Sequence, residues 1–203
     1  MILYEKDRGL YLNLTNRCPV SCSFCIKMPW DYQFEGHDLR IKGPEPTAPA
    51  LIAALKEKLD TSDYWREVVF CGFGESTYRL EEMKKVGHYL KTQHPELRQR
   101  LNTVGLGSLI WDRDITPELA AFLDEVAVSL NTADPKQWVE LMHPAPTYRE
   151  NGFAASRLFA ERCVAAGIKT RVTAVELPEV DLAPLQSYAR KIKADFIARP
   201  VLA

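Results

Sequence analysis

Three cysteines lie close together in the run Cys18-Pro-Val-Ser-Cys22-Ser-Phe-Cys25. Thiolates are the usual ligands of iron–sulfur clusters, and three of them can hold three irons of a four-iron cubane. The fourth iron then keeps an open position for a cofactor, as a catalytic zinc does with its free position. The spacing therefore predicts a [4Fe–4S] cluster with Cys18, Cys22 and Cys25 as its ligands.

A structural zinc site is the alternative use of these thiols. Structural zinc takes four ligands, and the sequence offers no second Cys-x-x-Cys and no close histidine pair. His37 could complete the set, so this alternative stays open. The chain has five cysteines, and an odd number argues against a disulfide framework. Cys71 and Cys163 are expected to be small buried side chains.

The elements that must position the cysteine run alternate between strands and helices. Strands are expected over residues 9–15, 67–71, 101–106, 126–130, 168–175 and 196–198, and helices over residues 47–59, 80–97, 117–123, 154–166 and 182–192. Such a chain crosses over between parallel strands. A full eight-unit barrel takes about 250 residues. The 203 residues therefore predict an α/β fold, a partial TIM barrel of about (β/α)6 with its helices outside, in a single domain over residues 1–203. A doubly wound open sheet is the competing architecture.

Composition limits the partners of the chain. The formal charge is −1, from 26 basic and 27 acidic residues without long blocks of one sign, so a nucleic-acid partner is not expected. The N-terminus is charged by Glu5, and no apolar stretch approaches the ~20 residues that span a bilayer. These features predict a cytoplasmic protein that does not bind a membrane.

The cysteine run resembles the signature of the radical S-adenosylmethionine superfamily, which has the same spacing and an aromatic residue, here Phe24, before the third cysteine. The resemblance implies a cluster whose open iron chelates the amino and carboxylate groups of S-adenosylmethionine. It implies that one-electron reduction cleaves this cofactor to a 5′-deoxyadenosyl radical, which abstracts a hydrogen atom from substrate. An external electron donor such as flavodoxin or ferredoxin would supply the electron.

The segment Cys71-Gly72-Phe73-Gly74-Glu75 resembles the Gly-Gly-Glu-Pro motif of that superfamily, with Ser76 in place of proline. Gly72 and Gly74 would let the backbone approach the cofactor closely. Glu75 would accept hydrogen bonds from the methionyl ammonium group. Taken alone, this motif would more often be an ordinary turn between a strand and a helix. Its position after the cysteine triplet is what indicates a cofactor contact.

Four further residues are candidates for cofactor contacts because they follow later strands. Ser129 and Asn131 stand where the superfamily places ribose contacts, although a strand-end cap is an equal alternative. Glu176 follows the fifth strand, and Arg199 follows the sixth. Arg199 would bind a carboxylate of cofactor or substrate or form a surface ion pair. The C-terminal ends of parallel strands converge where barrels carry their chemistry, so we expect these residues to meet the cysteine run there.

Over nearly its whole length the chain looks like the small TatD-linked radical S-adenosylmethionine proteins. The resemblance lies in Leu12-Asn-Leu-Thr-Asn-Arg-Cys18, Glu45-Pro46-Thr47, Cys71-Gly-Phe-Gly-Glu75, Ser129-Leu-Asn131, Thr173-Ala-Val-Glu-Leu-Pro178 and the Arg199 end. It implies a functional link to a TatD-type hydrolase. His143 departs from the pattern, because that family carries an arginine there.

The sequence is compatible with three functions and assigns no catalytic residue. The first is an enzyme that abstracts hydrogen from an unidentified substrate, in which the aromatic loop around Trp30 and Phe34 covers the site. The second is an activase that installs a glycyl radical on a protein partner through the open side of a short barrel. The third is a non-enzymatic electron-transfer protein, against which the Gly-x-Gly-Glu motif argues.

Overall fold

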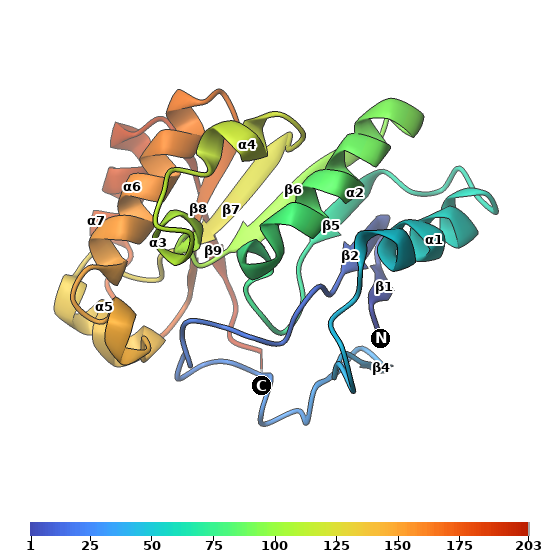
Figure 1. Ribbon diagram of the computed structural model, residues 1–203. Helices are drawn as coiled ribbons and strands as arrows, with labels where there is room; N and C mark the ends of the chain where they lie inside the picture. Colours follow the sequence, from blue (N-terminus) through green and yellow to red (C-terminus); the bar gives the residue numbers. More distant parts are fainter. Residues whose placement is uncertain (203) are drawn as a thin grey trace.

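The computed structural model describes residues 1–202, in which one mixed sheet of seven strands forms the body of the molecule (Figure 1). The strands are β1 (Leu3–Lys6), β2 (Gly9–Leu12), β5 (Glu67–Phe70), β6 (Arg98–Thr103), β7 (Glu125–Ser129), β8 (Lys169–Val175) and β9 (Asp195–Arg199). Their spatial order follows the chain order from β1 to β9. A doubly wound sheet reverses its order at a switch point, so this alternative is wrong and the partial barrel is confirmed.

The six strands from β2 to β9 pair in parallel, as the sequence predicts. The seventh strand, β1, pairs with β2 in antiparallel register and was not predicted. It is joined to β2 by a tight turn in which Asp7 has a positive φ of 53°. Its four residues are too few to show a clear alternation of apolar and polar side chains.

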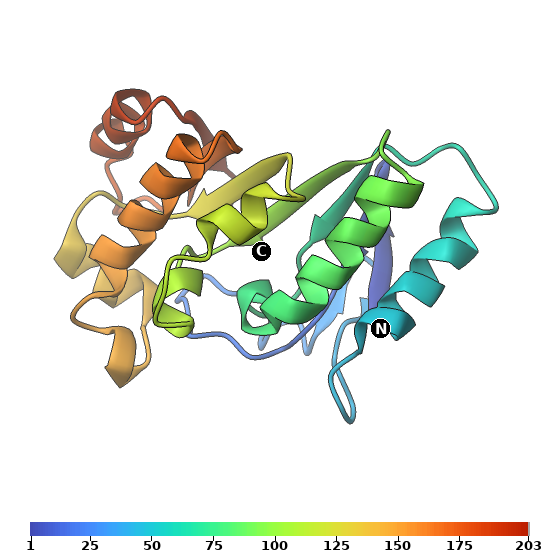
Figure 2. The same ribbon diagram turned by 45° about the horizontal axis from the view of Figure 1, so that its top comes forward.

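The helices cover one side of the sheet. They are α1 (Ala48–Leu59), α2 (Leu80–Gln93), α3 (Gly107–Ile110), α4 (Thr116–Ala120), α5 (Pro135–Met142), α6 (Gly152–Ala165) and α7 (Ala183–Lys191), with short 3-10 turns η1 (Ser76–Arg79) and η2 (Pro146–Tyr148). In Figure 2, α1 in cyan, α2 in green and α6 in orange lie in front of the strands. Helix α5 was not predicted; Asp134 caps it by accepting a hydrogen bond from Gln137, and Pro135 is its first residue.

The two faces of the sheet differ in chemistry because successive strand residues point to opposite sides. The face under the helices is apolar and fully buried, with Leu10, Leu12, Val68, Phe70, Leu101, Val126, Val128 and Val172. The opposite face, which we call the concave face, carries Glu67, Arg98, Arg100, Glu125 and Arg171. Arg100 lies 2.8 Å from Glu67, and Arg171 lies 2.8 Å from Glu125. A closed barrel fills this space with branched apolar side chains, whereas here ion pairs line it.

Helix α2 packs tightly against the segment before β7. A Cβ on Gly87 would lie only 2.2 Å from the Phe122 ring, so glycine is needed there for close packing. Strand β6 begins at Arg98, three residues before the predicted start at residue 101. Its polar residue Gln99 is buried and donates to the Gly87 carbonyl oxygen at 3.0 Å. Because Gln99 is polar, the sequence pattern did not predict that it belongs to a buried strand.

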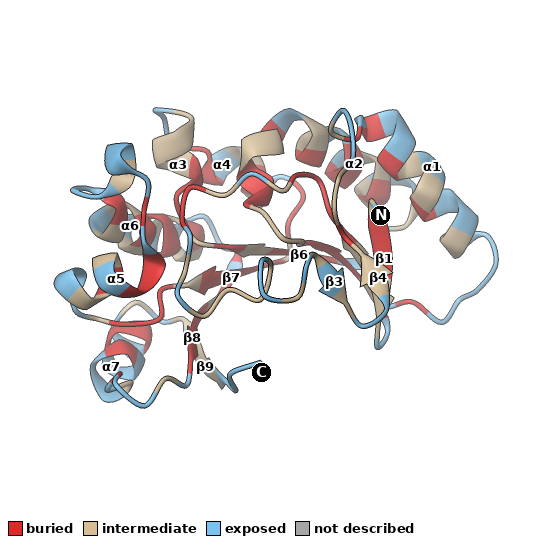
Figure 3. Ribbon diagram, turned by 90° about the horizontal axis from the view of Figure 1, so that it is seen from below, coloured by how far each residue is buried: buried red, intermediate tan, exposed pale blue. Residues whose placement is uncertain are grey.

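The long connection over residues 26–46 contains a small hairpin, β3 (Gln33–Phe34) and β4 (His37–Asp38). In Figure 3 the hairpin lies on the concave side of the sheet near β1, away from the helices. Phe34 stacks with Trp30 at a ring separation of 6.3 Å and meets Phe73 edge-on at 6.4 Å. The hairpin is therefore joined by aromatic contacts to the loop that follows β5. No helix within residues 1–202 has both the length and the apolar character that crossing a membrane requires.

Candidate functional site

The cysteine loop (residues 18–25) follows β2 and rests on the C-terminal end of α5. The backbone nitrogen of Ser21 donates to the Met142 carbonyl at 3.0 Å, and that of Ser23 donates to the Leu141 carbonyl at 2.8 Å. A bridge between Val20 and Pro144 extends the contact. The last carbonyls of a helix have no partners within it, and here the cysteine loop supplies them.

The three thiols belong to one loop and influence one another. Burial raises the pKa of the Cys18 thiol to about 12. Burial also raises the pKa of Cys22, and charge on the neighbouring Cys18 and Cys25 raises it further. Three thiolates in one loop are the donor set that an iron–sulfur cluster uses, and a bound cation would relieve their mutual repulsion.

A fourth protein ligand for these thiols is not found within the described part of the chain. No three His, Cys, Asp or Glu side chains among residues 1–202 are gathered closely enough to hold a metal ion, and this includes the three cysteines of the loop. His37 lies on β4, with its ring 6.0 Å from that of Tyr4. By ligand type and number alone, three cysteines match a cluster with an open iron better than a four-ligand zinc site.

Glu75 is fully buried and has only protein partners. Its Oε1 accepts hydrogen bonds from the Thr77 backbone nitrogen and hydroxyl, at 3.1 and 2.8 Å. Its Oε2 accepts from the Thr103 hydroxyl at 2.9 Å and from the Val104 backbone nitrogen at 2.8 Å. A carboxylate has about four acceptor positions, and these contacts use them all. The resemblance implies that Glu75 binds an ammonium group, whereas in this structure it ties the loop after β5 to the end of β6.

Gly72 and Gly74 are needed for contacts within the protein. A Cβ on Gly74 would lie 2.3 Å from the Thr15 carbonyl oxygen and 2.7 Å from that of Arg17. A Cβ on Gly72 would lie 2.2 Å from Asn13 Oδ1. The close approach expected at these glycines is therefore made to the strand end that leads into the cysteine loop.

Asn131 is buried at the end of β7, and each end of its amide has a protein partner. Its Oδ1 accepts from the Val175 backbone nitrogen at 3.1 Å, and its Nδ2 lies 3.2 Å from Met142 Sδ. These contacts match the strand-end cap that the sequence left open. Ser129 keeps a hydroxyl on the concave face, 3.3 Å from the Thr173 hydroxyl.

Arg199 and Glu176 lie side by side in the backbone, because the Glu176 nitrogen donates to the Arg199 carbonyl at 2.8 Å. The Arg199 guanidinium donates to the Ser129 hydroxyl at 3.1 Å. Burial lowers the pKa of Arg199, whereas charge on the nearby Cys71 and Cys22 thiols would raise it. Among residues 1–202 neither Arg199 nor Glu176 has an oppositely charged side chain within ion-pair distance.

Cys71 and Cys163 differ in their surroundings. Cys163 is fully buried on α6, as expected. Cys71 is only partly buried, and its Sγ accepts a hydrogen bond from Asn102 Nδ2 at 3.3 Å on the concave face. The structure therefore brings Cys71, Ser129 and Arg199 toward the same side as the cysteine loop.

Sequence reasoning missed the residues that hold the site together. Met142 belongs to the unpredicted helix α5, and Asn13 is a buried strand-end residue that donates to the Leu39 carbonyl at 2.7 Å. Thr103 is a third, through its bond to Glu75. The one available signal was Asp134-Pro135, a helix start of the capped type.

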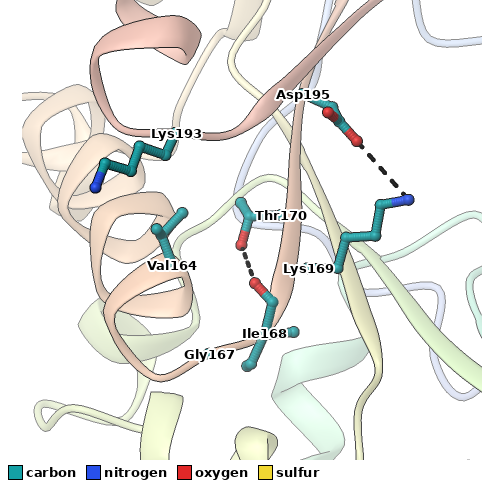
Figure 4. A pocket seen from close by; sticks show the side chains of 7 residues that line it. All are labelled: Val164, Gly167, Ile168, Lys169, Thr170, Lys193 and Asp195. Carbon is teal, nitrogen blue, oxygen red and sulfur yellow. Dashed lines mark hydrogen bonds and ion pairs between the residues drawn. The ribbon is translucent and has the colours of Figure 1, made fainter.

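A shallow pocket shown in Figure 4 lies elsewhere. Lys169, at the start of β8, and Asp195, at the start of β9, form part of its lining. These residues stand at the N-terminal ends of parallel strands, the opposite edge of the sheet from the cysteine loop. The pocket is therefore separate from the candidate site.

Comparison with known proteins identifies relatives of part of this chain. No protein-family model matches the chain. GTP 3′,8-cyclase from two strains of Corynebacterium glutamicum is 31% identical over 189 residues, covering 89% of this chain and 45% of the cyclase. The chain thus spans less than half the length of the curated relatives it matches.

Solved structures share the fold. Streptococcus suis SuiB bound to S-adenosylmethionine superposes with a TM-score of 0.66 at 18% identity, covering 97% of this chain and 41% of SuiB. A radical SAM methyltransferase from Sphaerobacter thermophilus superposes with a TM-score of 0.63 at 16% identity, covering 98% of this chain and 68% of the methyltransferase. At these identities the likeness establishes a common fold.

Proposed function

We propose that the chain is a radical S-adenosylmethionine enzyme, a superfamily membership that the cyclase relative and the structural neighbours support. In this proposal it removes a hydrogen atom from a substrate that is not yet identified. The observation that carries it is a loop of three cysteines at the C-terminal end of a partial barrel, where parallel barrels hold their reacting groups.

Cys18, Cys22 and Cys25 would hold a [4Fe–4S] cluster. When bound together with S-adenosylmethionine, this group supplies the electron that cleaves the sulfonium to a 5′-deoxyadenosyl radical. The chain itself fixes the loop that carries the thiols, through the backbone bonds from Ser21 and Ser23 to α5. Gly72, Gly74 and Glu75 would shape the neighbouring wall through their contacts with the strand ends.

The polar groups that can contact the cofactor are those whose hydrogen-bonding positions are not all occupied within the protein. Glu176 is exposed and its carboxylate is available to an ammonium or hydroxyl group, whereas Glu75 is fully engaged. Ser129 offers a hydroxyl, and Arg199 offers a guanidinium that suits a carboxylate or phosphate. Asn131 would act by holding the end of β7 in place.

The substrate would enter on the concave face. This face is lined by polar groups and bordered near β1 by the aromatic hairpin (Figure 3). Trp30 and the hairpin residue Phe34, together with Phe73 of the loop after β5, would cover part of the site. The glycyl-radical activase and the electron-transfer protein receive no support from the relatives.

An external electron donor, such as flavodoxin or ferredoxin, belongs to the proposal because the cluster must be reduced before it can pass on an electron. A functional link to a TatD-type hydrolase rests on the sequence resemblance alone. Oxygen sensitivity would follow from an open iron, so loading requires anaerobic conditions.

Cluster loading tests the proposal, with Cys22→Ala and Cys163→Ala as a matched pair. After anaerobic reconstitution we expect about four irons per wild-type chain, with the visible absorbance of a thiolate-ligated cluster. Cys22→Ala should lose this absorbance, while Cys163→Ala, a buried helix position, should keep it. Unchanged iron content and absorbance in Cys22→Ala would place the metal elsewhere.

A further inference from the structure

The thioether of Met142 lies between the cysteine loop and the end of β7. Its Sδ is 3.7 Å from Cys22 Sγ and 3.2 Å from Asn131 Nδ2. Met142 and Asn131 are both fully shielded from solvent. A buried amide N–H needs a partner, and besides a longer contact of 3.4 Å with the Ser129 carbonyl, the sulfur is the partner of Nδ2.

The position of Asn131 is fixed from the strand side. Its backbone is left-handed, with φ 65°, and its Oδ1 is held by the Val175 backbone nitrogen at 3.1 Å. Its own backbone nitrogen donates to the Thr173 carbonyl at 3.2 Å. The amide therefore cannot turn without breaking bonds to β8, and its Nδ2 stays directed at Met142.

Met142 meets the cysteine loop through two different groups. Its carbonyl oxygen accepts from the Ser21 nitrogen at 3.0 Å, and its sulfur contacts the Cys22 thiol. The residue is the last of α5, and His143 follows in left-handed geometry with φ 42°. A turn of this kind leaves the end of the helix fixed in position.

We propose that Met142 is a positioning residue for Cys22, and that Asn131 acts through its sulfur to couple the cysteine loop to the ends of β7 and β8. The proposal rests on the proposed function in that Cys22 is taken as a cluster ligand. It gives Asn131 a role that does not require contact with ribose. A thioether is flexible and polarisable, so it can follow the loop while keeping both contacts.

The first experiment uses the metal-free protein and measures the rate of iodoacetamide alkylation of Cys22 relative to Cys25, resolved by fragment-ion mass spectrometry. The variants are Met142→Leu, which keeps the size and removes the sulfur, and Asn131→Asp, which keeps the acceptor for Val175 and removes the N–H donor. Each should raise the ratio several-fold. The double variant should do no more than the larger single change, because both disrupt one coupled contact.

Met83→Leu is the matched control, since Met83 is equally buried but lies on α2. It should leave the ratio at the wild-type value. A wild-type ratio in Met142→Leu, or effects that multiply in the double variant, would overturn the proposal.

The second experiment uses the cluster-loaded protein and measures the midpoint potential by titration monitored with electron paramagnetic resonance. Met142→Leu and Asn131→Asp should shift the potential in the same direction, and Met83→Leu should not. Equal potentials in all variants would contradict the proposal. If the wild-type protein takes up no iron, the proposed function fails while the alkylation experiment still decides the role of Met142.

Discussion

The Glu75 carboxylate lies 2.9 Å from the hydroxyl of Thr103, and this bond joins the loop after β5 to the end of β6. The carboxylate has no exposed surface to offer a ligand. Burial raises its pKa, while its hydrogen bonds to Val104 and Thr77 act in the opposite direction. A motif that resembles a cofactor contact thus also serves as a link between two strands.

Replacing Glu75 with Gln should therefore destabilise the fold. The amide NH2 would face donors that now meet a carboxylate oxygen, and hydrogen bonds to a charged group contribute about 1.5–3 kcal/mol. We expect a loss of ~3 kcal/mol in the free energy of unfolding, measured by urea denaturation. Glu176→Gln, at an exposed position, should change it by less than about 0.5 kcal/mol. Wild-type stability in Glu75→Gln would show that its buried bonds are dispensable.

Replacing Gly74 with Ala should force the loop after β5 away from the strand end that leads into the cysteine loop. The new Cβ would meet the Thr15 and Arg17 carbonyl oxygens, which are backbone atoms and cannot rotate aside. We expect a cost of ~3 kcal/mol, read from the unfolding midpoint. Gly43→Ala is the comparison, because it has open space and only a positive φ of 115°, at a cost of about 1–2 kcal/mol. Equal costs would mean that the close approach at Gly74 is unimportant.

The concave-face ion pairs should make stability depend on pH. Burial raises the pKa of Glu67, but its bonds to Arg100 and Arg98 outweigh this and hold the pKa below its usual range. A carboxylate whose pKa is lowered in the folded state stabilises the fold at pH values above its unfolded-state pKa of about 4.3. This stabilisation is lost as the pH falls through the folded-state pKa. Urea midpoints between about pH 6 and pH 3 should fall less steeply in Glu67→Gln than in wild type. Parallel curves would rule out this source of acid sensitivity.

Arg199 should contribute to ligand binding more than to folding. Its guanidinium has a hydroxyl partner, Ser129, and no ion pair within residues 1–202. Arg199→Gln should weaken binding of a ligand that presents a carboxylate or phosphate group by about 1.5–3 kcal/mol, measured by calorimetry with S-adenosylmethionine and, separately, with inorganic phosphate. Arg190→Gln on α7 is the control for a change of net charge. Unchanged affinity for both ligands would show that Arg199 is a surface residue that does not bind them.

Much of the architecture follows from the sequence because buried parallel strands are continuous apolar runs. Glu67-Val-Val-Phe70 and Glu125-Val-Ala-Val-Ser129 show this pattern, and the structure has strands at both places. Helix α5 was not predicted because it has only eight residues. Its buried side chains, Trp138, Leu141 and Met142, show only two turns of helical periodicity. The start of β6 was not predicted, because the polar Gln99 is buried only through its hydrogen bond to the Gly87 carbonyl. That contact forms in the folded chain and cannot be seen in the sequence.

The site was predictable in part. Spacing alone indicated the three cysteines, and the sheet edge follows from their position after β2. The partners of Glu75 and Asn131 were not predictable, because Thr103 and Val175 lie 28 and 44 residues away and meet them only in the folded chain. Short motifs identify a residue's place in the fold more reliably than the atoms it bonds.

Release of 5′-deoxyadenosine would show that the chain cleaves S-adenosylmethionine reductively. Protein reconstituted anaerobically with iron and sulfide, then reduced with dithionite, is incubated with S-adenosylmethionine and analysed by liquid chromatography and mass spectrometry. We expect 5′-deoxyadenosine from wild type and none from Cys22→Ala. No 5′-deoxyadenosine from a wild-type protein that carries an intact, reduced cluster would contradict the proposed function.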